Sequence, residues 1–87
     1  MARYELRVRP SAAKDLRGIP NADVKRILAR MEDLRDGPRG AGCEKLSSTE
    51  LYRARQGVYR IVYEIHDERV VVEVIRVGHC SDVYRGR

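Results

Sequence analysis

The 87-residue sequence contains no tryptophan, no phenylalanine, and only two cysteines. Its five aromatic residues are all tyrosines. A chain of this length forms one domain, residues 1–87. It is too short to enclose a large cofactor and also keep a core. We therefore expect a single domain that uses no cofactor.

The two cysteines, Cys43 and Cys80, lie far apart in the sequence and belong to no CxxC motif or Cys/His cluster. This pattern predicts neither a disulfide scaffold nor a zinc site. No paired carboxylates stand at the end of an expected strand, and no ligand cluster suggests a divalent metal. We therefore expect two reduced thiols, no metal, and metal-free chemistry if the protein is an enzyme.

Long apolar runs are also missing. No stretch reaches the roughly 18 apolar residues of a membrane span. Residues 1–20 carry seven charged side chains and have no apolar core for a signal peptide. These absences predict a cytoplasmic protein with no membrane partner.

Positive charge is abundant. Eighteen Lys and Arg against 13 Asp and Glu give a net charge of +5, and 15 of the 18 basic residues are arginine. A basic balance favours an acidic partner, either nucleic acid or an acidic protein. Residues 37–44, with three glycines and one proline, are expected to form a loop. These glycines match no phosphate-binding motif, because neither GxGxxG nor GxxxxGK is present.

Hydrophobic periodicity predicts an α+β fold in the order β-α-α-β-β-β. Strict alternation indicates a strand over residues 4–9, and a period near 3.6 indicates helices capped by Ser11 and Asn21. Three further strands are expected at Leu51–Arg55, Val58–Ile65 and Val70–Val77. The last is apolar on both faces and belongs in the interior of the sheet. We expect both helices on one face of a mainly antiparallel sheet, with the other face open.

The register of the first hairpin identifies a candidate site. A turn at Gln56-Gly57 would pair Arg53 with Arg60 and place both, together with Arg55, on the open face. Like charges placed opposite each other are destabilising, whereas three guanidinium groups on one face suit a phosphate. A solvated basic face without a ligand is the alternative, since exposed arginines cost little in salt.

Two other polar side chains, His79 and Tyr84, are ambiguous, and a third, His66, is not. His79 has an unperturbed pKa close to neutral and could transfer a proton, or it could be an ordinary surface residue. Tyr84 could contact a phosphate or act as a base, or it could anchor the C-terminus on the core. His66 stands beside Asp67 and Glu68 and is expected in a solvated turn.

The run YRARQGVYRIVYEI at residues 52–65, the valine-rich strand after it, and the later Gly78-His79 and Asp82–Arg85 resemble RelE-type toxins of type II toxin–antitoxin modules. The likeness spans essentially the whole chain, and its specific part is the second half. It implies a microbial-ribonuclease-like fold and a toxin that cuts mRNA in the ribosomal A site. The implied reaction is attack of a ribose 2′-hydroxyl on the adjacent phosphate. The implied partners are a RelB-type antitoxin, held in a hetero-oligomer, and the ribosome with its mRNA.

Carried over by position, the resemblance assigns catalysis to Arg53, Arg55, Arg60 and Tyr84, with His79 as a further proton-transfer candidate. Many members have an arginine where this chain has Cys80. Arg76 or Arg85 could substitute in binding the substrate. Some relatives also continue into a C-terminal helix beyond the position of Arg87. Two alternatives remain: a ParE-like inhibitor of DNA gyrase with the same fold, and an attenuated RelE-like toxin that cuts poorly.

Cys80→Arg should raise the rate of cleavage about 10-fold or more, if the new guanidinium reaches the scissile phosphate. A thiol cannot offer the bidentate positive charge that the family's usual arginine supplies. Single-turnover rates on the same programmed ribosomes give the comparison. An equal or slower rate for the variant would show that another group already fills this role.

Overall fold

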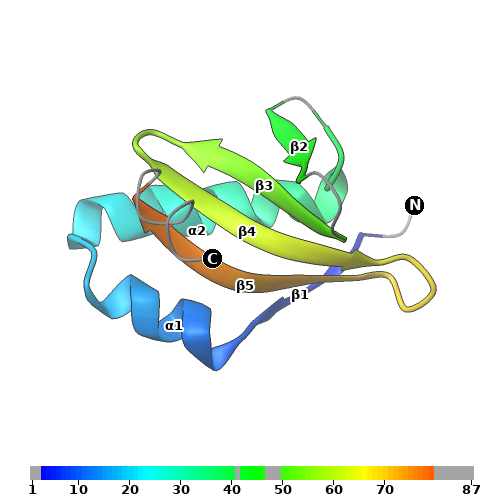
Figure 1. Ribbon diagram of the computed structural model, residues 1–87, viewed down its shortest axis with the longest axis horizontal. Helices are drawn as coiled ribbons and strands as arrows, with labels where there is room; N and C mark the ends of the chain where they lie inside the picture. The colour runs from blue at the N-terminus through cyan, green and yellow to red at the C-terminus, as the bar shows by residue number, and fades with distance from the viewer. Residues whose placement is uncertain (1–2, 41, 47–49, 80–87) are drawn as a thin grey trace.

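The computed structural model describes residues 3–40, 42–46 and 50–79. The secondary structure elements, in chain order, are β1 (Glu5–Val8), α1 (Pro10–Arg17), α2 (Asn21–Asp36), β2 (Cys43–Lys45), β3 (Leu51–Gln56), β4 (Tyr59–His66) and β5 (Val71–His79) (Figure 1). Neither helix is long and apolar enough to cross a membrane.

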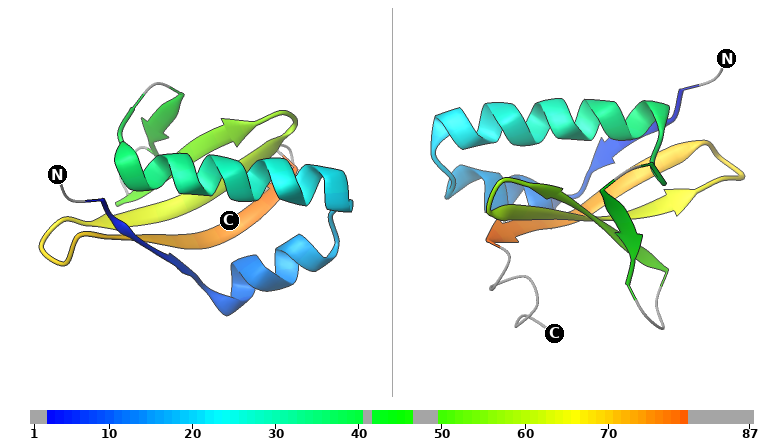
Figure 2. Two further views of the ribbon diagram at one scale, coloured as in Figure 1. Left: turned by 180° about the vertical axis from the view of Figure 1, so that it is seen from behind. Right: turned by 90° about the horizontal axis from the view of Figure 1, so that it is seen from above.

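The strands form one sheet in the order β1-β5-β4-β3-β2. Strand β1 runs parallel to β5, and every other neighbouring pair is antiparallel. Both helices lie on the same side of this sheet (Figure 2). The predicted α+β class is confirmed, as are the order of the helices and longer strands and the interior position of β5. The three-residue strand β2 at the sheet edge was not predicted, because its segment is short and follows glycines.

The core lies between α2 and the covered face of the sheet. The α2 residues Ile27, Met31 and Leu34 recur at helical spacing and are fully buried. They pack in one cluster with strand residues that alternate along β3, β4 and β5: Ala54, Ile61, Tyr63, Val72, Val74 and Val77. Burial of this apolar surface makes the main favourable contribution to the free energy that holds the helix on the sheet.

Helix α1 begins one residue before its predicted cap, Ser11, and α2 begins at its predicted cap, Asn21. Pro10 is the first residue of α1, where its missing N–H costs nothing. Neither helix has a side-chain cap. The capping roles expected for Ser11 and Asn21 are therefore wrong, and the Ser11 hydroxyl instead donates to the backbone oxygen of Ile75 at 2.6 Å.

Helix α1 continues along the edge of β5 where β1 stops. Strand β1 pairs with β5 only as far as Val74. Beyond that point Ser11 binds the carbonyl of Ile75, and a carboxylate oxygen of Asp15 accepts the N–H of Val77 at 2.9 Å. These side chains form hydrogen bonds with backbone groups of β5 that would otherwise lie unpaired at an open edge of the sheet.

The hairpin register differs from the predicted one by two residues. The turn is Gly57-Val58, with Gly57 in the left-handed region at φ 62°, and Gln56 pairs with Tyr59. The predicted turn at Gln56-Gly57 is therefore wrong. A shift of two residues is one full period of the strand, so every side chain keeps its predicted face.

Tyr63→Phe should destabilise the fold by about 1–3 kcal/mol, because the buried hydroxyl donates to the buried carbonyl of Pro38 at 2.6 Å and that carbonyl would lose its partner. Urea denaturation measures the change. Tyr4→Phe is the matched control, since its exposed hydrogen bond to Asp67 should contribute less. Equal losses in the two variants would contradict this interpretation.

Candidate anion-binding site

Three arginines line one pocket on the open face of the β3–β4 hairpin. Arg55 and Arg60 lie directly opposite each other, and Arg53 lies opposite Val62. The pair of facing arginines is thus Arg55 with Arg60, not Arg53 with Arg60 as predicted. A pocket of about 340 Å³ is lined by Gly42, Cys43, Glu44, Arg53, Arg55 and Arg60. The three basic residues grouped from the sequence do gather at one place.

The three guanidinium groups differ in their exposure to solvent. Arg60 is buried, with 8% of its surface exposed, whereas Arg53 is half-buried and Arg55 is exposed. A cation away from bulk water attracts an anion more strongly than an exposed one. Of the three arginines, buried Arg60 should therefore attract an anion most strongly and exposed Arg55 least strongly.

Glu44 places a carboxylate among these arginines. It belongs to β2, lies opposite Arg53 in the β2–β3 ladder, and forms an ion pair with that guanidinium. Glu44 was not predicted as a site residue, because residues 37–44 were expected to form a loop. The only local signal is the alternation of Cys43 and Glu44, which is too short to indicate a strand.

Arg30 from α2 holds this edge of the sheet in place. Its guanidinium donates to the carbonyl of Arg55 at 3.4 Å and contacts the sulfur of Cys43 at 3.6 Å. Gly42 has φ 82°, and a Cβ at that position would come within 3.1 Å of the Arg30 guanidinium. The glycine therefore allows both the turn into β2 and the close approach of Arg30.

His79 lies on a different face from Arg60. In the β4–β5 ladder Arg60 faces Gly78, while His79 faces Tyr59 and meets its ring edge-on at 6.2 Å between centroids. Tyr59 packs on the helix-covered side of the sheet. A proton-transfer role for His79 stays a prediction. Because His79 is the last residue of β5, its imidazole would have to reach the substrate around the end of that strand.

Arg76 is engaged outside the pocket. Its guanidinium donates to both carboxylate oxygens of Asp15, at 2.9 and 3.3 Å, and this ion pair raises the pKa of Arg76. Its assignment to substrate binding stays a prediction. Cys80, Tyr84 and Arg85 lie outside the described residues, so their predicted roles also remain predictions.

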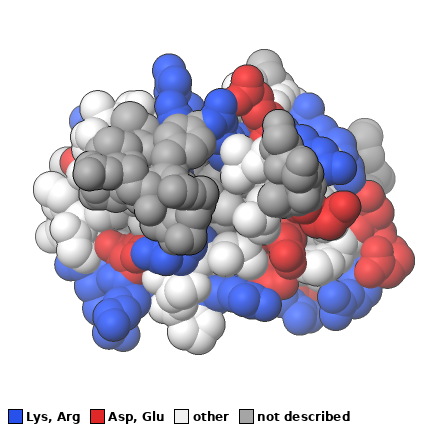
Figure 3. All heavy atoms as spheres, viewed as in Figure 1, with Lys and Arg blue, Asp and Glu red and all other residues white. Residues whose placement is uncertain are grey.

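The open face carries acidic as well as basic groups (Figure 3). Glu64 and Glu73 lie opposite each other in the β4–β5 ladder. His66 is the last residue of β4 and half-buried, so its predicted place in a solvated turn is wrong. The sequence analysis expected no paired carboxylates at the end of a strand, whereas Glu64 and Glu73 face each other two residues from the end of β4.

The comparisons with known proteins decide the family. Residues 6–84 match the model of the ParE toxin of the parDE type II toxin–antitoxin system. Toxin RelG of Mycobacterium tuberculosis is 36% identical, over 94% of this chain and 97% of the relative. This chain belongs to the RelE/ParE superfamily of type II toxins.

Solved structures of superfamily members share the fold. The toxin–antitoxin complex RelBE2 of Mycobacterium tuberculosis includes a chain of 30% identity and TM-score 0.80, with 91% of this chain and 93% of that chain covered. The intact RelBE complex of Escherichia coli gives 30% identity and TM-score 0.76, with 87% and 95% covered. The predicted membership is confirmed, and the two helices on a mixed sheet are those of RelE-type structures.

Glu44→Gln should strengthen the binding of inorganic pyrophosphate by about two- to fivefold, because the carboxylate competes with the anion for Arg53 and a partly exposed ion pair is worth roughly 0.5–1 kcal/mol. Titration followed by NMR of the arginine side chains measures the affinity. Glu50→Gln removes an exposed carboxylate outside the pocket lining and should change nothing. An equal gain in both variants would mean that only the net charge matters.

Proposed function

We propose that this RelE/ParE superfamily protein is the toxin of a type II toxin–antitoxin module and cleaves mRNA in the ribosomal A site. The observation that carries this proposal is the gathering of Arg53, Arg55 and Arg60 around one pocket. An arrangement made only for stability would not set Arg55 opposite Arg60, because facing like charges destabilise a sheet. Three guanidinium groups at one site suit a phosphodiester.

The proposed reaction is an internal phosphoryl transfer. The ribose 2′-oxygen forms a bond to the adjacent phosphorus, and the bond from phosphorus to the 5′-oxygen of the next nucleotide breaks. The products are a 2′,3′-cyclic phosphate and a 5′-hydroxyl, so the proton lost from the 2′-hydroxyl is balanced by one gained at the leaving oxygen. Negative charge that builds on the phosphorane oxygens would be stabilised by the arginines, above all by buried Arg60.

Proton transfer requires groups besides the arginines. Tyr84 and His79 remain the candidates that the resemblance suggests. Among the described residues that line the pocket, the Glu44 carboxylate can also accept a proton once a substrate phosphate has displaced it from Arg53.

The ribosome would supply the alignment of the substrate. The pocket lies on an open sheet face, which cannot by itself hold a flexible RNA with its 2′-oxygen in line with the leaving oxygen. The isolated protein should therefore cut free RNA very slowly. A ribosomal target also places the protein in the cytoplasm.

The proposed neutralising partner is a RelB-type antitoxin. Solved relatives include RelB–RelE complexes from Escherichia coli and Pyrococcus horikoshii. A net charge of +5 favours an acidic antitoxin segment, and such a segment would fold against the toxin as it binds. We expect a hetero-oligomer of the two proteins.

Inhibition of DNA gyrase is the second candidate function, because the matching family model is that of ParE toxins. A gyrase inhibitor has no chemical need for three arginines around one pocket. An attenuated RelE-like toxin, weakened by Cys80, would keep the same pocket and differ only in its rate.

Arg60→Ala should lower single-turnover cleavage on programmed ribosomes by about 10²- to 10³-fold, the usual loss on removal of one group that stabilises transition-state charge. Circular dichroism and thermal unfolding verify that the variant is folded. Arg69→Ala removes an exposed arginine between β4 and β5 and is the matched control.

Two measurements separate the alternatives. Wild-type protein should leave gyrase supercoiling unchanged and should cut naked RNA far more slowly than ribosome-bound mRNA. Unchanged cleavage by a folded Arg60→Ala variant would overturn the assignment of the site. Inhibited supercoiling without mRNA cleavage would favour the gyrase function.

A further inference from the structure

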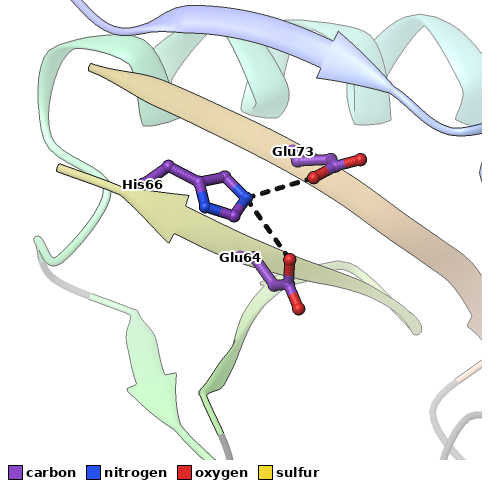
Figure 4. A group of neighbouring side chains, drawn as sticks. All are labelled: Glu64, His66 and Glu73. Atoms are coloured by element: carbon purple, nitrogen blue, oxygen red, sulfur yellow. Dashed lines mark hydrogen bonds and ion pairs between the residues drawn. The ribbon is translucent and has the colours of Figure 1, made fainter. Parts of the chain in front are cut away.

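A second group of polar side chains lies on the open sheet face, on other residues than those of the arginine pocket. The ring nitrogen Nε2 of His66 is 3.3 Å from a carboxylate oxygen of Glu64 and 3.1 Å from one of Glu73. Figure 4 shows the imidazole directed toward both carboxylates, with Glu64 and His66 on β4 and Glu73 on β5. One ligand atom from each residue lies within 4.8 Å of the other two.

The strand geometry forces this approach. Glu64 and His66 are two residues apart on β4 and so point to the same face, and Glu64 lies opposite Glu73 in the ladder. Facing carboxylates repel each other, and a neutral imidazole can donate its Nε2 proton to only one of them at a time. A cation at the centre would compensate both negative charges together.

The spacing suits a small divalent ion. Ligand atoms at about 2.1 Å from a metal lie about 3.0–3.4 Å from one another, and both separations from the imidazole nitrogen fall in that range. The second oxygen of Glu73 accepts the Arg9 guanidinium at 2.8 Å, which leaves the first oxygen turned toward His66. Such an outer contact orients a carboxylate for metal binding.

We propose that Glu64, His66 and Glu73 form a binding site for a first-row divalent transition metal such as Zn²⁺, with solvent in the remaining coordination positions. The imidazole distinguishes this site from those of Mg²⁺ and Ca²⁺, which take oxygen ligands. All three side chains are half-buried, between 22% and 32% exposed, so the ion can enter without opening the fold. A bound ion would link β4 to β5 and stabilise that hairpin.

Isothermal titration of the full chain with Zn²⁺, under reducing conditions, tests the proposal. Wild-type protein should bind one equivalent at this site, and a large excess of Mg²⁺ should not displace it. His66→Gln should weaken this binding at least 10-fold. Glu68→Gln is the matched control, because Glu68 is an exposed carboxylate in the adjacent turn, and it should leave the affinity unchanged.

The two cysteine thiols could bind zinc elsewhere, so the titration is repeated with the Cys43→Ser, Cys80→Ser double variant. This variant should still bind one equivalent of Zn²⁺. Thermal unfolding provides a second readout: Zn²⁺ should raise the melting temperature of this double variant but not that of the same protein with Glu64→Gln. Absence of binding in the cysteine-free protein would overturn the proposal, as would full affinity in the His66→Gln variant. Either result would leave His66 as a hydrogen-bond donor to one of the two carboxylates at a time, without affecting the proposed cleavage at the arginine pocket.

Discussion

The burial of one face of the β3–β4 hairpin against α2 is the constraint on which the rest of the molecule depends. Ala54, Ile61 and Tyr63 are completely buried on that face. Because side chains alternate along a strand, the residues between them must point the other way. The apolar core therefore determines where the arginines lie, although none of them contributes to its hydrophobic surface.

This arrangement has an electrostatic cost that the fold does not require. Arg55 faces Arg60, and Arg60 is mostly withdrawn from water. Strand β2 adds Glu44 beside Arg53 and compensates part of the positive charge. The same feature makes the pocket suitable for the proposed phosphate, since an incoming anion would replace the Glu44 carboxylate and meet a preformed group of cations. The electrostatic repulsion between the arginines and the proposed affinity for phosphate thus have one cause.

The open sheet face is also divided along its length. Arginines line the pocket beside the Gly57-Val58 turn, while Glu64, His66 and Glu73 gather toward the other hairpin. Arg9 and Arg76 are exposed but already paired, because Glu73 and Asp15 form ion pairs with them. Positive charge counted over the chain therefore overstates the positive charge available to a ligand, and position within the sheet decides which arginines can act.

The sequence by itself determined the α+β class, the two faces of the hairpin and the grouping of Arg53, Arg55 and Arg60. These conclusions hold although the turn of the β3–β4 hairpin was predicted one residue too early. The resulting shift in strand pairing is two residues, a full strand period, and it leaves each side chain on its predicted face. Only the tertiary structure decided that Glu44 joins the pocket, since a three-residue strand after glycines carries no periodic signal. It also decided that Asp15 holds Arg76 and that His66 meets Glu64 and Glu73. Those contacts join residues across strand pairings and helix packing, and local periodicity cannot reveal which distant partners will meet.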